Sequence, residues 1–358
     1  MSSKTIEDIS VATSTTHILV IRLSAMGDVA MTVPVLRIVV QTYPNVKITV
    51  VTKKAFEPIF MGIDNVSVYI AEVSGRHKGI FGLNRLAKEV RNLGIDAVAD
   101  LHNVLRSNVL RNLFALRNIK VAQIDKGRDE KKALIKAKGK VFEPLKSMHQ
   151  RYADVFENLG FPIDLDTYQA PEKPQLSAKI NALTETSTKK WLGIAPFAQY
   201  ESKTYPYEQI VEVIRVLSEE NQIEIFLFGG GKREKDILNV IASKYKNVTN
   251  VVGQLSFEEE LSLIGNLDGM LSMDSGNGHL AAIYNIPVIT LWGVTHPYLG
   301  FVPFGQPLEN SLLSDTKVYN QIPTSVYGNK FPEGYENVMQ TIAPQTVTNA
   351  IKEILQIS

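Results

Sequence analysis

The sequence has no cysteine, and none of its apolar runs approaches the about 18 residues that a membrane-spanning helix needs. The absence of cysteine excludes disulfides, thiolate metal sites and a cysteine nucleophile. Residues 1–16 are polar and acidic and lack the apolar segment of a secretory signal, so we expect a frayed tail and a cytoplasmic protein. Apolar residues make up 44% and charged residues 21% of the 358, which is typical of a globular chain with about two domains.

The net charge of +1 is unevenly distributed along the chain. Residues 1–170 carry 24 basic and 17 acidic side chains, a balance of +7, and residues 171–358 carry 14 and 20, a balance of −6. The densest basic run, residues 126–151, has nine Lys or Arg against Asp129, Glu130 and Glu143. Such a run forms either a solvated face or a surface for an anionic partner. It lacks interleaved aromatics, so we expect no nucleic-acid partner.

Short β-branched runs alternate with segments of helical spacing in both halves of the chain. We predict strands over 17–23, 46–52, 66–70, 96–101, 119–124, 191–196, 223–228, 248–252, 269–273 and 287–292. We predict helices over 29–41, 83–92, 104–116, 207–218, 234–243, 257–264 and 279–284. This alternation predicts an α/β protein with two doubly wound parallel sheets that face each other across a cleft.

Prolines 162, 171 and 174 interrupt a polar stretch between the two halves, where we place a linker. The predicted division is a tail (1–16), an N-terminal domain (17–170), a linker (171–189), a C-terminal domain (190–340) and a terminal helical segment (341–358). Ligands of such sheets bind at the carboxyl ends of the strands, so the loops there carry the chemistry.

The loop after the first predicted strand, residues 22–28, ends in Asp28 at the start of a helix. Asp28 is either a helix cap or a carboxylate at the cleft that accepts a proton from a substrate hydroxyl. Since the loop has one glycine, the three-glycine dinucleotide fingerprint is absent.

Two loops of the second half carry weaker signals. Lys203 precedes Pro206 at a predicted helix start, which is a favourable place for a phosphate but also a common place for a solvated lysine. Residues 228–232 (FGGGK) do not match the phosphate-binding loop, because Phe226 replaces its first glycine and Arg233 its Ser/Thr.

The segment 274–279 (DSGNGH) is the most informative. It places a carboxylate, a hydroxyl, two glycines and an imidazole within six residues, directly before a helix. Such a loop can bind a diphosphate together with sugar hydroxyls. A capped helix with a glycine turn explains Asp274 and Ser275 but not this density of polar groups.

Metal binding has little support in the sequence. Asp164 and Asp166 form an Asp-x-Asp triplet, which in some transferases binds a divalent cation, but it stands in the proline-rich stretch rather than at a strand end. The six histidines include no i,i+3 or i,i+4 pair, which disfavours zinc. We expect no metal and no other cofactor.

Three segments, in this order, resemble those of one known family. Residues 22–37 (RLSAMGDVAMTVPVLR) resemble the opening motif of the ADP-heptose:lipopolysaccharide heptosyltransferases, glycosyltransferase family nine. Residues 203–206 (KTYP) are similar to that family's Lys-x-Trp-Pro, and 274–282 (DSGNGHLAA) to its Asp-Thr/Ser-Gly-x-x-His-Leu-x-Ala signature. The resemblance covers roughly residues 17–305 and implies the GT-B fold, with two Rossmann-like domains.

The resemblance also implies the site. Asp28 matches the family's catalytic base, and donor contacts fall on Lys203, Glu258, Asp274, Ser275, Gly276 and His279. For the acceptor we expect contacts from Ser24, Gly27, His102, Asn103, Arg106, Lys131 and Lys132. One departure is His296, where the family has Asp in Gly-Pro-Thr-Asp-Pro; this change bears on donor choice. The fold also implies that the C-terminal helix, near 346–355, packs on the first domain.

These implications predict an inverting, metal-independent glycosyltransferase. It would move a heptose or related sugar from a nucleoside-diphosphate sugar, ADP-heptose first, to an anionic glycolipid, with peripheral contact to the inner face of the inner membrane. Two alternatives stay open: another GT-B enzyme, such as one with a different donor or a sugar-nucleotide epimerase, and a non-enzymatic two-lobed sugar-binding protein. A screen of several nucleotide sugars would distinguish the first alternative from a heptosyltransferase. Ligand binding without turnover would favour the second.

Overall fold

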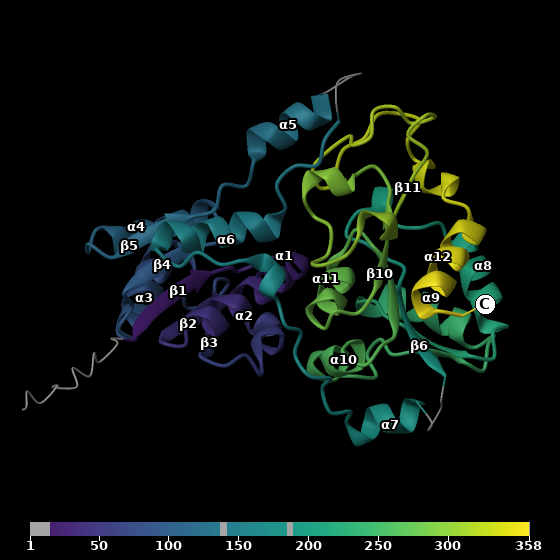
Figure 1. Ribbon diagram of the computed structural model, residues 1–358, viewed down its shortest axis with the longest axis horizontal. Coiled ribbons are helices and arrows are strands. Elements are labelled where there is room, and N and C mark those ends of the chain that lie inside the picture. Colours follow the sequence, from purple (N-terminus) through teal and green to yellow (C-terminus); the bar gives the residue numbers. More distant parts are fainter. Residues whose placement is uncertain (1–14, 137–141, 185–188, 358) are drawn as a thin grey trace, which may run out of the picture.

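A computed structural model describes residues 15–136, 142–184 and 189–357. Most of the predicted tail, residues 1–14, lies outside these ranges, and the first strand begins at Thr16. The described part is an α/β protein with two parallel sheets, one in each half of the chain (Figure 1). This confirms the predicted fold class.

The N-terminal sheet has five strands in the order β3-β2-β1-β4-β5, and all neighbours are parallel. Its strands are β1 (Thr16–Ile21), β2 (Val46–Thr52), β3 (Val66–Ile70), β4 (Ala97–Asp100) and β5 (Lys120–Gln123). Its helices are α1 (Met26–Ala30), α2 (Thr32–Thr42), α3 (Gly79–Arg91), α4 (Leu105–Ala115), α5 (Arg128–Lys136) and α6 (Met148–Leu159). Helices α2 and α6 pack on one face and α3 and α4 on the other, because β1, β2 and β4 are apolar on both faces.

The second sheet has six parallel strands in the order β11-β10-β9-β6-β7-β8. Its strands are β6 (Lys190–Ala195), β7 (Ile223–Leu227), β8 (Val248–Asn250), β9 (Gly269–Met273), β10 (Val288–Trp292) and β11 (Ser311–Leu313). Its helices are α7 (Ala178–Thr184), α8 (Tyr207–Ser218), α9 (Gly231–Ala242), α10 (Phe257–Ile264), α11 (Gly276–Ile283) and α12 (Pro344–Leu355). Helices α10 and α11 lie on the side that meets the first sheet, and α8, α9 and α12 on the other (Figure 1).

The predicted packing of the C-terminal helix on the first domain is wrong. Helix α12 buries Val347, Ile351 and Leu355 in the core of the second sheet, beside α8, β9 and β10. Its apolar residues recur at the i, i+4, i+8 spacing of a single helix face. That face packs against the second sheet, so α12 has no second apolar face to pack on the first domain.

The predicted helix over 29–41 is two helices, α1 and α2, that meet at Met31. Pro34 has no N–H to donate to the carbonyl of Ala30, which weakens a continuous helix at this point. The Thr32 hydroxyl instead donates to the carbonyl oxygen of Val29 at 2.7 Å. Asp28 lies in the first turn of α1, which follows the end of β1, and therefore stands at the carboxyl edge of the sheet.

Close approach of two short helices joins the halves of the molecule. A Cβ atom on Gly27 of α1 would lie 3.2 Å from Cα of Gly276 and 3.1 Å from Cδ2 of His279, both in α11. A Cβ atom on Gly276 would lie 2.4 Å from Cε of Met26. Glycine at both positions therefore lets the two backbones meet at the centre of the cleft.

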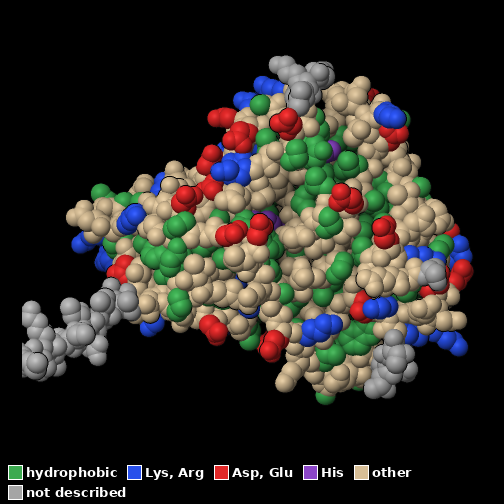
Figure 2. Space-filling view, in the orientation of Figure 1, with side chains coloured by type: hydrophobic (Ala, Val, Ile, Leu, Met, Phe, Trp, Pro, Cys, Tyr) green, Lys and Arg blue, Asp and Glu red, His purple; other side chains and the backbone are tan. Residues whose placement is uncertain are grey.

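The basic run of residues 126–151 does not form one solvated face. Arg151 is buried and pairs with Glu130 at 2.5 Å, and Lys131 is also buried. Lys132 and Lys136 are exposed on α5, whereas Lys138 and Lys140 lie outside the described residues. On the face in Figure 2, charged side chains of both signs are scattered over both halves of the molecule. No helix in the described ranges is long and apolar enough to span a bilayer.

Candidate active site between the two sheets

A cavity of about 660 Å³ lies between the carboxyl edges of the two sheets. From the first sheet it is lined by Arg22, Ser24, Ala25, Met26, Gly27, Asp28, Met31, His102 and Lys126. From the second half it is lined by Phe197, Ala198, Gln199, Tyr200, Lys203, Phe228, Gly229, Gly230, Glu234, Phe257, Glu260, Asp274, Ser275, Gly276, Asn277, His279, Phe301, Val326 and Tyr327. Strand ends of both sheets thus converge on one space, as parallel sheets require.

Asp28 is held by a buried arginine that follows β1. A guanidinium nitrogen of Arg22, Nη2, lies 2.6 Å from Oδ2 of Asp28, and Nη1 donates to the carbonyl oxygen of Leu101 at 2.7 Å. The backbone N–H of Ala25 also donates to Oδ2, at 3.3 Å. These contacts within the described chain all use Oδ2, so Oδ1 is the oxygen left for a ligand, and the side chain is 30% exposed.

Two basic groups stand near Asp28 on the same side of the cavity. Burial, followed by the charges of Arg22 and Lys126, lowers the pKa of His102 to about 3, so its imidazole is neutral. Burial and Arg22 lower the pKa of Lys126 to about 8. Since both shifts come first from loss of water, this wall of the cavity strengthens electrostatic contacts with a bound ligand.

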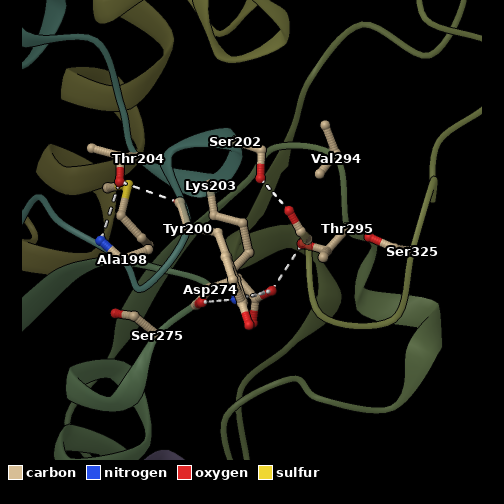
Figure 3. Close-up of polar contacts among 12 residues, drawn as sticks. Ala198, Tyr200, Ser202, Lys203, Thr204, Asp274, Ser275, Val294, Thr295 and Ser325 are labelled. Atoms are coloured by element: carbon tan, nitrogen blue, oxygen red, sulfur yellow. Dashed lines mark hydrogen bonds and ion pairs between the residues drawn. The ribbon is translucent and has the colours of Figure 1, made fainter. Parts of the chain in front are cut away.

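Lys203 and Asp274 form the opposite wall (Figure 3). The ammonium of Lys203 donates to the carbonyl oxygen of Asp274 at 2.8 Å and to its Oδ2 at 3.2 Å. The Thr295 hydroxyl donates to the same Oδ2 at 2.8 Å. An ammonium has three N–H groups, so one is left for a further acceptor, and Oδ1 of Asp274 is left for a donor.

A backbone contact fixes the loop that carries Lys203. The N–H of Val294 donates to the carbonyl oxygen of Ser202, and a Cβ atom on Gly293 would lie 2.1 Å from that oxygen. Glycine at 293 therefore allows the loop after β10 to approach the loop after β6. This approach brings Thr295 to Asp274 and sets the position of Lys203.

His279 lies in α11 and is almost fully buried at the bottom of the cavity. Burial lowers the pKa of its imidazole to about 4, so the ring is neutral near pH 7. Its Nδ1 atom is buried without a hydrogen-bond partner among the described residues. The ring packs where Gly27 and Gly276 meet, which places it between the two walls.

The structure brings together nine of the residues that the sequence indicated. These are Ser24, Gly27, Asp28, His102, Lys203, Asp274, Ser275, Gly276 and His279, which all line the cavity. They come from the ends of β1, β4, β6 and β9. The clustering agrees with the expected positions, and the individual roles stay proposals.

Five predicted contacts do not line this cavity. Glu258 is exposed on α10, and Arg106 and Lys132 are exposed on α4 and α5. Asn103 uses its side-chain amide to donate to the carbonyl oxygen of Ile124 at 2.8 Å. Lys131 is buried, with Nζ 3.2 Å from Sδ of Met148 and 4.1 Å from the centre of the Phe301 ring.

Two of these five lie in surroundings that differ from those expected. A buried Lys131 cannot meet an acceptor that approaches from solvent, and burial lowers its pKa to about 7. On α10 it is Glu260, two residues after Glu258, that faces the cavity. Glu234, Glu260 and Lys126 are cavity residues that the sequence reasoning missed, although Glu234 and Glu260 each follow a predicted strand end within one or two helical turns.

His296 is not a cavity residue. Its Nδ1 accepts a hydrogen bond from the backbone N–H of Tyr298 at 3.1 Å and caps a short 3₁₀ helix (Pro297–Leu299). An aspartate at this position would serve as a cap in the same way. The change from the family pattern therefore alters packing against Phe142 and Tyr298 rather than the cavity wall.

Asp164 and Asp166 are exposed and lie away from the cavity. Asp164 Oδ1 accepts from the backbone N–H of Asp166 at 3.0 Å and caps a 3₁₀ helix (Leu165–Thr167). Within the described ranges, no three His, Asp or Glu side chains are grouped as metal ligands would be. The triplet thus has a local structural role.

The comparisons with known proteins agree with one another. The family model of glycosyltransferase family 9 (heptosyltransferase) matches residues 83–322. Lipopolysaccharide core heptosyltransferase OpsX of Haemophilus influenzae is 24% identical over 345 residues, which cover 94% of this chain and 96% of that protein. Lipopolysaccharide heptosyltransferase 1 of Campylobacter coli is 26% identical over 299 residues, covering 78% and 85%.

Solved structures show the same fold. A glycosyl transferase family 9 structure from Veillonella parvula has a TM-score of 0.73 at 18% identity and covers 96% of this chain and 98% of its own. Escherichia coli ADP-heptose lipopolysaccharide heptosyltransferase II has a TM-score of 0.67 at 20% identity, with coverage of 95% and 98%. Escherichia coli heptosyltransferase WaaC with ADP has a TM-score of 0.63 at 21% identity, with coverage of 94% and 99%.

Proposed function

The chain belongs to glycosyltransferase family 9, the heptosyltransferases, and from that premise we propose that it transfers a heptose from ADP-heptose to a lipopolysaccharide core or related anionic glycolipid, with inversion at the sugar and without a metal. One observation carries the proposal. The cavity places an aspartate on one wall and a lysine on the other, and within the described ranges one oxygen of the aspartate and one N–H of the lysine have no partner.

The reaction is a single displacement. The acceptor hydroxyl attacks the anomeric carbon, the new C–O bond forms, and the bond from that carbon to the diphosphate oxygen breaks. The proton of the hydroxyl passes to Oδ1 of Asp28, and ADP leaves with the bonding electron pair. Positioned proton transfer of this kind contributes roughly 10²–10⁴-fold to the rate.

Arg22 positions the base rather than acting on substrate. It binds Oδ2 of Asp28 and the Leu101 carbonyl from a fully buried position, so the carboxylate cannot rotate freely. The ring of Tyr152 supports the guanidinium at 5.9 Å, and its hydroxyl donates to the carbonyl oxygen of Asp28 at 3.4 Å. A fixed base reduces the reorganisation that proton transfer requires.

The leaving diphosphate is stabilised on the second wall. The third N–H of Lys203 reaches one phosphate, and the backbone N–H groups at the start of α11, at Gly276 and Asn277, reach the other. Oδ1 of Asp274 accepts from a heptose hydroxyl. Neutral His279 lies between these groups and Asp28, where it can hydrogen-bond to the sugar without adding charge.

The relatives support the choice of substrates. The curated relatives are lipopolysaccharide core or lipopolysaccharide heptosyltransferases, and WaaC has been solved with ADP and with ADP-2-deoxy-2-fluoro heptose. On the acceptor side, Lys126 supplies a cation at the cavity wall and exposed Lys132 and Lys136 supply further charge. We place the acceptor and its membrane on this side of the cleft.

The test is a transfer assay with defined substrates. Purified protein is mixed with ADP-heptose and a lipopolysaccharide core acceptor, and both ADP release and acceptor mass are followed. The proposal predicts one ADP for each heptose added to the acceptor. ADP release without mass gain, or transfer only from UDP- or GDP-sugars, would contradict it and favour another GT-B enzyme.

A further inference from the structure

Three consecutive glutamates at the start of α10 have three different environments. Glu258 is exposed to solvent. The carboxylate of Glu259 accepts from the backbone N–H of Ser256 at 2.8 Å and from the Ser177 hydroxyl at 3.1 Å, so it caps the helix. Glu260 is half-buried and lines the cavity; its backbone N–H donates to the carbonyl oxygen of Ser256, but its carboxyl group has no hydrogen-bond or ion-pair partner in the described part of the chain. Glu259 caps the helix, so capping does not explain why a carboxyl group is present at position 260.

Along the second sheet, Glu260 follows β8, which lies three strands away from β9, the strand before Asp274. The strands run β9-β6-β7-β8, with Asp274 after β9, Lys203 after β6, Gly229 and Gly230 after β7, and Glu260 in the helix after β8. Neighbouring strands lie about 4.8 Å apart, so this edge spans roughly 14 Å. That distance suits a nucleoside diphosphate laid across the strand ends, with phosphates near Lys203 and the base near α10.

The surroundings of Glu260 suit a flat ring with one polar edge. Met31, Phe228 and Phe257 line the same cavity, and all three pack into or against the shared apolar core. Another cavity carboxylate, Glu234, already accepts from the N–H of Gly230 at 2.6 Å. An apolar floor with one free polar group is the usual composition of a ligand pocket.

We infer that Glu260 selects the nucleobase of the donor by accepting a hydrogen bond from an exocyclic amino group, as adenine presents. The inference rests on the proposed function, because it takes the cavity as the nucleotide-sugar site. Burial raises the pKa of Glu260 to about 7. Both the ionised and the neutral carboxyl keep an oxygen that accepts from an amino group, and the neutral form can also donate to a ring nitrogen beside it.

Binding of nucleotides alone tests the inference by calorimetry, without turnover. The probes are ADP, purine riboside 5′-diphosphate, which lacks the amino group, and 2′-deoxy-ADP, which lacks a ribose hydroxyl. A hydrogen bond to a charged group predicts that the wild type binds ADP roughly 10-fold more tightly than the purine analogue. In Glu260→Ala this preference should fall to about twofold or less through loss of ADP affinity.

Two further variants control for folding and position. Glu260→Gln keeps an accepting oxygen at the same place and should retain a clear preference for ADP. Glu258→Ala removes a carboxylate from the same helix outside the cavity and should keep the wild-type preference.

The outcomes separate this inference from the proposed function. If the wild type binds ADP but Glu260→Ala keeps the full preference for the amino group, the inference is overturned and the proposed function stands. If the substitution removes discrimination against 2′-deoxy-ADP instead, Glu260 binds ribose and the inference is likewise wrong. If the wild type binds none of the diphosphates, both proposals fail together.

Discussion

At the scale of single residues, the proposed chemistry depends on which oxygen or N–H of each side chain already has a hydrogen-bond partner within the protein. Asp28 presents Oδ1 because Arg22 and the Ala25 N–H both take Oδ2. Lys203 presents one N–H because Asp274 takes two. A buried charge that loses its partner is costly, so substitutions here affect both stability and activity, and each test needs a readout for both.

Asp28→Asn should reduce kcat about 10²–10⁴-fold, because the amide keeps the shape of the carboxylate but accepts no proton. ADP affinity should stay near the wild-type value, since Asp28 lies on the opposite wall from Lys203. Arg22 keeps its bond to the Leu101 carbonyl, so the protein should fold with a lowered Tm. Single-turnover kinetics and a thermal melt measure these quantities, and full turnover in the variant would rule out Asp28 as the base.

Lys203→Ala should weaken binding of ADP far more than binding of adenosine, because its free N–H is assigned to phosphate. A charge-assisted hydrogen bond is worth about 1.5–3 kcal/mol. Thr295→Val is the matched control: it removes the other contact to Asp274 Oδ2 and leaves the lysine in place. Calorimetry on both ligands decides the matter, and equal losses for ADP and adenosine would contradict a phosphate contact.

His149 should make the protein less stable in acid. It is buried against Phe304, its Nε2 has no partner in the described chain, and burial lowers its pKa to about 3. The unfolded chain, with an ordinary His pKa near 6.5, binds the proton that the folded chain refuses. The neutral His149 therefore contributes its full share of the free energy of unfolding above pH 6.5. This share is lost as the pH falls toward 3, at up to about 1.4 kcal/mol per pH unit.

His149→Phe keeps a ring on Phe304 and removes this proton uptake. Urea unfolding between pH 4 and pH 7 should then show a shallower loss of unfolding free energy than in the wild type. An unchanged pH slope would mean that His149 is already protonated in the folded state.

At the scale of elements, the cleft is set by close backbone contacts that allow no side chain. Gly27 in α1 meets Gly276 in α11, and Gly293 after β10 meets the Ser202 carbonyl after β6. These contacts place Asp28 and Lys203, so the loops are positioned by the sheets rather than by their own propensities.

Gly293→Ala should impair both stability and donor binding. The added Cβ atom would lie 2.1 Å from the Ser202 carbonyl oxygen, a backbone atom that can yield only if the loop moves. That movement carries Lys203 away from Asp274, so we expect a lower Tm and weaker ADP binding in the same variant. Gly75→Ala, whose added Cβ atom would lie no closer than 3.6 Å to a neighbour and which lies outside the cavity, is the control. Wild-type ADP affinity in Gly293→Ala would show that the contact does not position the lysine.

Most elements could be predicted from periodicity and β-branching, including the ten strands that form the two sheets apart from β11. Strand β11 is only three residues long, too short for a pattern. Helix α6 was missed although Ser147 caps its start, accepting from the Gln150 N–H, and Gly160 ends it with φ of 100°. Both signals are present in the sequence, although the segment between them is interrupted by basic and acidic residues that obscure the apolar periodicity of the helix.

The site was harder to predict than the fold, because pocket residues on helices depend on rotation about the helix axis. Glu258 and Glu260 are two residues apart, and on a helix this spacing places them on different faces. The structure shows that Phe257 and Glu260 line the cavity, whereas Glu259 caps the helix and Glu258 is exposed. Burial of Lys131 likewise depends on Phe301, a residue far along the chain that no local pattern connects to it.

At the scale of the whole molecule, the two halves of the chain, each with one of the sheets that face the cavity, differ in charge: residues 1–170 have a balance of +7 and residues 171–358 a balance of −6. An anionic acceptor suits the first half, where Lys126 lines the cavity and Lys132 and Lys136 are exposed. Near an anionic membrane surface, each lysine contributes about 1 kcal/mol of favourable electrostatic energy. This attraction falls off within a Debye length of about 8 Å at physiological salt.

Lys132→Glu with Lys136→Glu should therefore raise the KM for a lipid-borne acceptor and leave ADP affinity unchanged. Lys131 is kept, because its burial would confound the result, and Lys138 lies outside the described residues. The wild-type acceptor KM should also rise with salt, while the double variant responds less. Equal acceptor KM values at low salt would show that these lysines are only solvated.

Transfer should continue in EDTA, because Asp164 caps a turn away from the cavity and Lys203 supplies the charge that a cation would otherwise supply. Initial rates with and without chelator, followed by addition of magnesium or manganese, measure this. Activity that returns only with the cation would assign the diphosphate to a metal.

The most direct test of the central claim is the stereochemistry of the product formed in EDTA. The wild type is given ADP-heptose of known anomeric configuration and a lipopolysaccharide core acceptor, and the new linkage is read from its anomeric proton coupling by NMR. Displacement assisted by Asp28 predicts the opposite configuration at the anomeric carbon, and formation of this product about 10²–10⁴-fold more slowly by Asp28→Asn. Retention of configuration, or an equal rate from the variant, would contradict the account.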